Sequence, residues 1–124
     1  MSDKTARQVI AMLEGVVSDE GTGELARVPG YHVAGKTGTV RKSASGGYAE
    51  DKYVALFAGM IPATSPRLVM VVEVNDPRNN QYYGGSVAAP VFSRVMSEAM
   101  RLLDIAPDDM PSLNGAKVAK AEVL

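Results

Sequence analysis

The stretch that decides the fold reads Tyr31-His-Val-Ala-Gly-Lys-Thr-Gly-Thr-Val40. β-Branched and aromatic residues are frequent in it, and these favour a β-strand. Glycine inside a strand often marks a place where a ligand or another backbone comes close, and both Gly35 and Gly38 lie inside this stretch. Residues 31–40 are therefore predicted to form a strand that borders a site.

Two more strands are predicted downstream. Residues 41–50 contain Ser-Gly-Gly and are expected to form a hairpin connection, which leads into a second strand at residues 52–61. Residues 67–74 are almost continuously apolar, which is typical of a strand covered on both faces. Because short turns join the neighbouring strands, the three are expected to form an antiparallel meander.

Helices are predicted on either side of the strands. Apolar residues recur every three or four positions in residues 3–17, and Ser2 or Asp3 can cap that helix. Residues 87–103 are predicted to form the second helix, with Ser86 as its cap. Its apolar face is predicted to consist of Val87, Val91, Val95, Ala99 and Leu102, with Phe92, Met96 and Leu103 beside them.

The predicted order of helix, three strands and helix is an α+β unit, in which an antiparallel sheet is flanked by N- and C-terminal helices. The helices are expected to cover one face of the sheet, so the other face of the third strand lacks a partner, which indicates further chain or a dimer. Residues 1–106 are assigned to this unit. Residues 107–124 hold two prolines and a glycine and are predicted to be a flexible C-terminal tail.

The composition excludes several classes of protein. The formal net charge is -1, so no general field attracts nucleic acid. The chain has no cysteine, and its single histidine argues against a histidine zinc site or a Ser-His-Asp triad, so no metal or cofactor is expected. No apolar run approaches the ~18 residues of a membrane span, and no signal peptide is visible, so an export signal or anchor is expected upstream.

The residues from Gly30 to Thr37 match the phosphate-binding pattern G-x-x-x-x-G-K-[ST]. A phosphate-binding loop follows a buried strand and opens a helix, so that main-chain N–H groups hold the phosphate. Here Gly30 follows Ala-Arg-Val-Pro, and the residues after Thr37 are poor helix formers. A nucleotide site is therefore the least favoured alternative.

Lys36-Thr37-Gly38-Thr39 supplies what an acyl-transfer site on a strand edge needs. Lysine attracts a carboxylate and adjusts proton transfer, threonine hydroxyls hydrogen-bond the carboxylate, and a main-chain N–H can face an oxyanion. Glycine leaves room for a substrate along the strand. The period of two puts Thr37 and Thr39 on one side and Lys36 on the other. The alternative is an edge strand whose lysine discourages aggregation.

Longer stretches surround this motif: Val33 to Val40, Tyr53 to Gly59, Pro62, Leu68 to Val74, and Tyr82-Tyr-Gly-Gly-Ser-Val-Ala-Ala-Pro-Val-Phe92. Together they resemble the end of a class B penicillin-binding protein, most closely the septal, cell-division type. The resemblance runs from about residue 5 to about residue 108. It implies the penicillin-binding/β-lactamase-like transpeptidase fold, with the Lys-Thr-Gly strand as an edge strand at the active site.

The resemblance also implies a role for each residue of the motif. Lys36 would assist proton transfer around a serine nucleophile. Thr37 and Thr39 would bind the carboxylate of the stem peptide or of a β-lactam, and the N–H of Thr39 would form half of the oxyanion hole. Gly38 would keep the cleft open.

Three tyrosines match positions that form an aromatic wall beside bound β-lactams in similar proteins: Tyr53, Tyr82 and Tyr83. Ordinary packing is the alternative for them. Arg41 either faces the cleft or is a solvated turn residue. His32 is expected on the strand surface rather than in catalysis, and Gly84-Gly85 are expected to meet a main-chain requirement before the last helix.

The function implied is that of a peptidoglycan D,D-transpeptidase, which cross-links stem peptides ending in D-Ala-D-Ala through a serine acyl-enzyme and is acylated by β-lactams. The nucleophile of that family lies in S-x-x-K and a second serine in S-x-N, both before the lysine motif. This chain has no S-x-x-K, and its S-x-N, Ser112-Leu-Asn114, lies in the predicted tail. The chain alone is therefore predicted to be inactive without the N-terminal part of the same domain.

The resemblance further implies a location at the periplasmic face of the bacterial inner membrane, with cell-division proteins as partners. Two alternatives to a transpeptidase stay open. One is a fragment of a class D β-lactamase or β-lactam sensor. The other is a non-catalytic α+β module that pairs its strand edge with a peptide.

Overall fold

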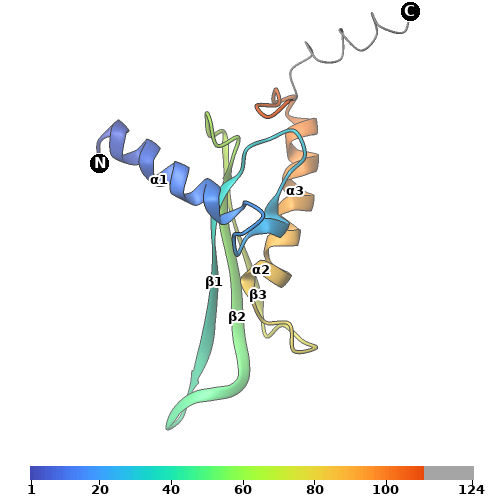
Figure 1. Ribbon diagram of the computed structural model, residues 1–124. Helices are drawn as coiled ribbons and strands as arrows, with labels where there is room; N and C mark the ends of the chain where they lie inside the picture. Colours follow the sequence, from blue (N-terminus) through green and yellow to red (C-terminus); the bar gives the residue numbers. More distant parts are fainter. Residues whose placement is uncertain (111–124) are drawn as a thin grey trace, which may run out of the picture.

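The computed structural model describes residues 1–110, and the side chains of these except residues 44 and 48–51. Three strands form one antiparallel sheet in the order β1-β2-β3. The strands are β1 (Ala34–Ala44), β2 (Gly47–Ile61) and β3 (Leu68–Asn75). The helices are α1 (Asp3–Val16), the short 3-10 helix η1 (Glu24–Ala26), α2 (Gly84–Val87) and α3 (Ala89–Leu102). The predicted α+β order of helix, three strands and helix is confirmed (Figure 1).

β1 and β2 form a longer hairpin than predicted. The strand expected at residues 31–40 begins at Ala34 and continues to Ala44, so residues 41–50 are mostly strand rather than connection. The turn is short because Gly46 and Gly47 have positive φ angles of 89° and 143°, which glycine adopts without steric cost. In Figure 1 the two strands run on beyond β3 as a projecting arm.

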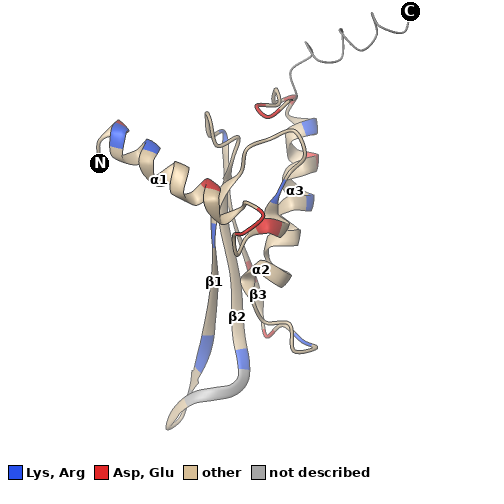
Figure 2. Ribbon diagram, viewed as in Figure 1, with Lys and Arg blue, Asp and Glu red and all other residues tan. Residues whose placement is uncertain are grey.

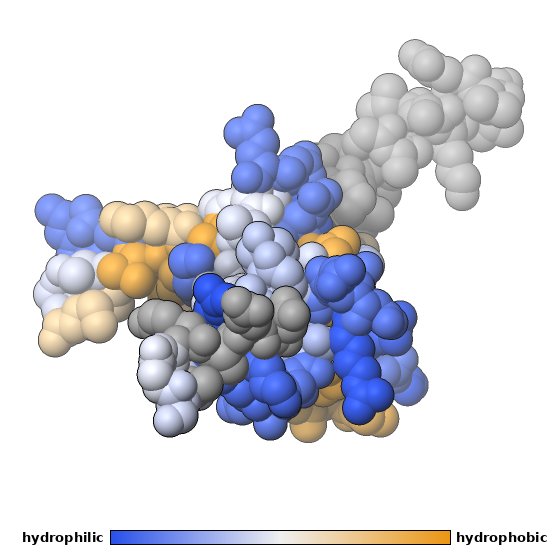
Figure 3. Space-filling model, turned by 90° about the horizontal axis from the view of Figure 1, so that it is seen from below, coloured by the Kyte–Doolittle hydropathy of each residue, from blue (hydrophilic) through white to orange (hydrophobic). Residues whose placement is uncertain are grey.

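α1 begins at one of its two predicted caps. The hydroxyl of Ser2 accepts a hydrogen bond from the N–H of Thr5 over 3.1 Å, which satisfies a free donor of the first turn. No residue of α1 is buried, and Met12 is 70% exposed. Figure 3 shows hydrophobic side chains on the side of the molecule where α1 projects. No helix within residues 1–110 combines the length and the apolar character that crossing a bilayer requires.

The second predicted helix consists of two helices that meet at Ala88. Ser86 lies inside α2, so its predicted role as the cap is wrong. The physical reason is that helical structure starts earlier, at Gly84, where the chain packs directly against the sheet. The helix after Ala88 has no side-chain cap, and Pro90 lies in its first turn, where a missing N–H has little cost.

The buried face of α3 is offset from the predicted one. It consists of Ala89, Phe92, Met96 and Met100, whereas Val91, Val95 and Leu102 are 41%, 47% and 73% exposed. The two stripes have similar spacing, so periodicity alone does not choose between them. The choice follows from the ring of Phe92, which meets that of Phe57 edge to face with centroids 4.9 Å apart. Both rings are fully buried and form the centre of the core.

Within the described residues the sheet has one covered face and one open face. Along β3 half-buried residues alternate with exposed ones, and Val69 and Val71 are 72% and 63% exposed. The prediction that this strand is covered on both faces is therefore wrong for residues 1–110, whereas the expected unpartnered face is present. We use the name open face for the surface of Lys36, Ala58, Val69 and Val71, which pairing places on one side of the sheet.

α1 lies at one corner of the open face rather than beside α3. Its Leu13 borders an apolar hollow of about 180 Å³ together with Met60 and Val69. The prediction that both helices cover the same face is therefore wrong. The loop between α1 and β1 is long enough to carry α1 around the β1 edge of the sheet (Figure 1).

Candidate functional site

The predicted motif lies on β1, an edge strand of the described sheet. Pairing with β2 decides which way its side chains face. Thr37 pairs with Phe57, which is buried under α3, and Thr39 shares that face because it lies two residues further on. Lys36 pairs with Ala58 and lies on the open face. The predicted alternation along the motif is therefore present.

Thr37 and Thr39 border a hollow of about 330 Å³, which we call the threonine groove. Its walls come from the loop around η1, from β1 and from α2. The other lining residues are Gly21, Thr22, Glu24, Tyr83, Gly84, Gly85 and Ser86. Three segments that are far apart in the sequence thus meet at the motif.

Hydrogen bonds hold both threonine hydroxyls against the walls of the groove. The Oγ1 atoms of Thr22 and Thr37 are 2.9 Å apart, and the N–H of Gly84 donates to Oγ1 of Thr39 over 3.2 Å. A hydroxyl that accepts a hydrogen bond still has its own proton to donate. The Thr39 hydroxyl can therefore donate to a ligand carboxylate in the groove.

The ammonium of Lys36 adds positive charge beside the Thr37 hydroxyl. Its Nζ donates to the main-chain oxygen of Thr37 over 3.1 Å and lies 3.4 Å from the Thr37 hydroxyl. A cation next to a hydroxyl is a combination that favours a carboxylate. Gly38 lies between the threonines and adds no side chain, and a Cβ there would lie 3.3 Å from the side chain of Leu56. Figure 2 shows this basic character continuing along β1.

Gly84 and Gly85 are required because the main chain of α2 touches the strands and the loop. A Cβ on Gly84 would lie 2.1 Å from the main-chain oxygen of Leu56 and 2.6 Å from that of Gly38. A Cβ on Gly85 would lie 2.1 Å from the main-chain oxygen of Thr22. The expected main-chain requirement is therefore confirmed, and its cause is close approach.

The three tyrosines form one aromatic cluster. The rings of Tyr53 and Tyr82 are stacked with centroids 4.0 Å apart, and those of Tyr82 and Tyr83 are 4.5 Å apart. The hydroxyl of Tyr82 donates to that of Tyr83, and this bond, followed by charge repulsion between the two, raises the pKa of Tyr82. Tyr83, which is 59% exposed, lines the threonine groove, whereas Tyr53 and Tyr82 are not among its lining residues. Arg41 pairs with Tyr53 and is exposed outside the groove lining.

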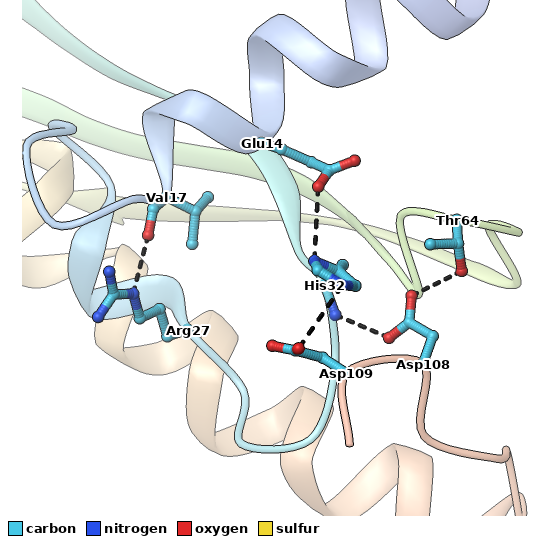
Figure 4. Close-up of polar contacts among 7 residues, drawn as sticks. All are labelled: Glu14, Val17, Arg27, His32, Thr64, Asp108 and Asp109. Atoms are coloured by element: carbon cyan, nitrogen blue, oxygen red, sulfur yellow. Dashed lines mark hydrogen bonds and ion pairs between the residues drawn. The ribbon is translucent and has the colours of Figure 1, made fainter. Parts of the chain in front are cut away.

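A second hollow, of about 450 Å³, lies beside the end of α1 and the loop before β1. His32 forms part of its wall, with Nδ1 3.5 Å from a carboxylate oxygen of Glu14 and Nε2 3.7 Å from one of Asp109 (Figure 4). Arg27 closes the other side, where its Nε donates to the main-chain oxygen of Val17 over 3.1 Å. His32 thus lies before β1 and outside the threonine groove.

The phosphate-binding pattern does not form a site in the described part of the chain. Beyond Thr37 the chain continues as a strand to Ala44, so the Gly30–Thr37 stretch opens no helix and the nucleotide alternative is wrong. Among the described side chains no group of three or more His, Asp or Glu residues could hold a metal ion. Ser112-Leu-Asn114 lies outside the described residues.

Three groove residues are not evident from the sequence pattern: Thr22, Glu24 and Ser86. A signal exists for Thr22, because it stands between Gly21 and Gly23. A Cβ at Gly21 would lie 2.0 Å from the main-chain oxygen of Val16, so the loop can pass this closely only with glycine there. Nothing comparable marks Glu24 or Ser86.

Known proteins resemble this chain along most of its length. The family described as the penicillin binding protein transpeptidase domain matches residues 1–97. A probable peptidoglycan D,D-transpeptidase PbpC from Pseudomonas aeruginosa is 48% identical over 110 residues, which are 89% of this chain and 20% of that protein. Peptidoglycan D,D-transpeptidase FtsI from Escherichia coli is 42% identical over 106 residues, 86% of this chain and 18% of that protein. The chain thus spans about a fifth of the length of these relatives.

A solved structure shares the fold. It is the apo structure of the TP domain from Burkholderia pseudomallei penicillin-binding protein 3, with a TM-score of 0.81 and 46% sequence identity. The match covers 90% of this chain and 33% of that one. The architecture described above is therefore similar to about one third of that chain.

Proposed function

Because this chain belongs to the penicillin-binding protein transpeptidase family, we propose that it is part of a peptidoglycan D,D-transpeptidase that cross-links stem peptides through a serine acyl-enzyme. The observation that carries this proposal is the threonine groove, which Thr37 and Thr39 line and where the Thr37 hydroxyl lies 3.4 Å from the ammonium of Lys36. These groups together favour a carboxylate. A peptide ending in D-Ala-D-Ala has such a carboxylate, and so does a β-lactam.

Each residue of the motif then has a role in the reaction. Thr37 and Thr39 bind the substrate carboxylate, and Lys36 assists proton transfer between the nucleophile and the leaving group. The N–H of Thr39 donates to the oxyanion that forms when the serine attacks the carbonyl carbon. Gly38 keeps the strand open along the substrate, and Tyr83, which lines the groove, contacts the bound β-lactam.

The nucleophile comes from the part of the protein outside these 124 residues, since the sequence has no S-x-x-K. The open face is where that part packs. Lys36 lies on this face, and Val69 and Val71 are 72% and 63% exposed there. A match to only 33% of the solved transpeptidase domain is consistent with a missing layer.

Location and partners follow from the proposed reaction. Peptidoglycan lies outside the bacterial inner membrane, so the enzyme acts at the periplasmic face of that membrane. A relative named FtsI supports a role in septal wall synthesis beside cell-division proteins. Among the alternatives, the relatives named as transpeptidases favour this function over a class D β-lactamase or β-lactam sensor. An exposed apolar sheet face argues against a self-standing peptide-binding module.

Labelling with a fluorescent penicillin tests the proposal. Source cells are treated with the reagent, and the native polypeptide carrying this segment is captured with an antibody raised against the chain. The expected result is a labelled band far larger than 13.1 kDa. An unlabelled band at that size would contradict it, and so would covalent labelling of the isolated chain, which is expected to be inactive.

Variants of the complete protein then test the motif. Lys36→Ala is expected to lower the rate of labelling about a hundredfold, a magnitude typical of removing one polar group from an acyl-transfer site. Thr39→Val is expected to weaken binding of the penicillin carboxylate. Lys4→Ala is the matched control, because Lys4 is an exposed lysine in the first turn of α1. A Lys36→Ala protein that labels as fast as the control would refute the assignment.

A further inference from the structure

The residues after α3 pack against the chain that leads into β1. We use the name clasp for Ile105 to Met110. Ile105 is 8% exposed and belongs to the core, and its main-chain oxygen accepts a hydrogen bond from the hydroxyl of Tyr31. The N–H of Asp109 donates to the main-chain oxygen of Gly30 over 3.0 Å. The first residues of the predicted tail are thus fixed to residues 30–32.

Asp108 lies at the centre of the clasp and uses both of its carboxylate oxygens. Oδ1 accepts the main-chain N–H of His32 over 2.7 Å, and Oδ2 accepts the hydroxyl of Thr64 over 2.6 Å (Figure 4). The main-chain oxygen of His32 in turn accepts the N–H of Ala63 over 2.8 Å. One side chain therefore joins three segments: the clasp, the chain that leads into β1 and the turn between β2 and β3.

The charge of Asp108 strengthens these bonds. Partial burial by itself raises the pKa of this carboxyl, but hydrogen bonds from the Thr64 hydroxyl and from the main chain of His32 and Thr64 outweigh burial and lower the pKa. Hydrogen bonds to an ionised acceptor are about twice as strong as those between neutral groups. The His32 ring lies between the carboxylates of Glu14 and Asp109, at 3.5 Å and 3.7 Å.

β1 depends on such contacts because it is an edge strand. Within the described sheet, β2 holds it on one side only. Its Thr39 end is held by the N–H of Gly84, and at its other end His32 lies two residues before the strand begins and four residues before Lys36. The two ends of the motif segment are thus fixed by different parts of the last third of the chain.

We propose that Asp108 is a positioning residue for the transpeptidase site: it acts through the main chain of His32 to hold β1, and with it Lys36 to Thr39, in the geometry that acylation needs. This inference rests on the proposed function. A reacting group that is displaced by about 1 Å can lose up to about a hundredfold in rate. Loss of the Asp108 contacts is expected to have a smaller effect on the acylation rate. His32 lies four residues from Lys36, and β2 still pairs with β1.

The test measures acylation of the complete transpeptidase by a fluorescent penicillin, with the rate constant and the final amplitude recorded separately. The amplitude reports how much protein is folded, whereas the rate constant reports the geometry of the folded site. Asp108→Ala is expected to lower the limiting acylation rate constant about tenfold. Asp108→Asn is expected to recover most of the rate, because its amide oxygen can accept from His32 while its NH₂ donates to the Thr64 hydroxyl.

Two further variants keep the test decisive. Thr64→Val removes one of the two bonds of Asp108. It is expected to lower the rate constant by more than the twofold limit of the control but by less than about tenfold. This variant therefore tests the inference even where Asp108→Ala fails to fold. Asp109→Asn is the matched control, since that carboxylate is 62% exposed and neither hydrogen bond of Asp108 involves it. Its rate constant is expected to stay within twofold of the unmodified protein.

A merely structural role would lower the amplitude of Asp108→Ala and Thr64→Val and leave their rate constants unchanged, which would overturn the inference. An asparagine variant as slow as the alanine variant would overturn it too. These results differ from failure of the proposed function, in which the unmodified protein itself is not acylated.

Discussion

The main-chain N–H of Gly84 donates a hydrogen bond to the hydroxyl of Thr39, although the two residues are 45 positions apart. The start of the last helix pair is thereby attached to the motif strand. Gly84 is a buried residue, and a buried N–H without a partner is costly. The contact links the stability of the chain to the hydroxyl that we assign to carboxylate binding.

Replacing Thr39 by valine is expected to destabilise the fold as well as the site. The substitution keeps the shape of the side chain but leaves the Gly84 N–H without its acceptor. An unsatisfied buried donor costs about 1–3 kcal/mol of unfolding free energy. Denaturant unfolding of the transpeptidase domain checks this. Thr39→Ser keeps the acceptor and is the control, and equal stability of the valine and serine variants would contradict the assigned bond.

Adding one methyl group to Gly84 is expected to lower the unfolding free energy by about 3 kcal/mol, in the range of overpacking substitutions. The new Cβ would lie 2.1 Å from the main-chain oxygen of Leu56, so α2 has to move. Gly15→Ala is a matched control, because nothing lies within 4 Å of a Cβ there. That change is expected to stabilise α1 by up to about 1 kcal/mol. Thermal unfolding that ranks the two variants the other way would contradict this packing.

Phe92→Ala tests the position of the core. Phe92 is fully buried and its ring meets that of Phe57 at 4.9 Å. Truncation of such a ring costs about 3–5 kcal/mol of unfolding free energy. Leu102→Ala, at a side chain that is 73% exposed, is expected to change it by less than about 0.5 kcal/mol. A large effect at Leu102 instead would mean that the predicted apolar stripe of α3 is the buried one.

The pH dependence of stability is expected to report the Asp108 contacts. Because hydrogen bonding outweighs burial, the folded-state pKa of Asp108 is lowered. Its contribution is complete above the unfolded-state pKa of about 3.9 and is lost as the pH falls through the lower folded value. The difference in unfolding free energy between the unmodified domain and Asp108→Asn should therefore shrink on acidification from pH 6. A difference that grows would show the opposite shift.

Local patterns in the sequence predict the strand of the motif well. The alternation of Lys36 with Thr37 and Thr39 follows from the two-residue period alone, and pairing with β2 only adds which face is buried. The start and end of each strand are less predictable. Gly46 and Gly47 form a tight turn, so residues that look like a connection belong to the hairpin.

Choices between two similar surfaces cannot be made from the sequence. α3 has two apolar stripes, and only the position of Phe57 across the sheet selects the one with Phe92. The groove residues Thr22 and Glu24 come from a loop, whose path depends on contacts with distant segments. Asp108 cannot be predicted from the sequence either, because its hydrogen bond to His32 forms only where the clasp packs against residues 30–32.

The separation of Asp108 from His32 along the chain has a consequence for the order of folding. β1 and β2 are consecutive, and such hairpins form in about 1–10 μs. The bond from His32 to Asp108 spans 76 positions, which a ribosome adding about 5–20 residues per second needs roughly 4 to 15 seconds to synthesise. The nascent motif strand can therefore form its hairpin seconds before Asp108 exists, and during that interval the chain leading into β1 lacks this hydrogen bond.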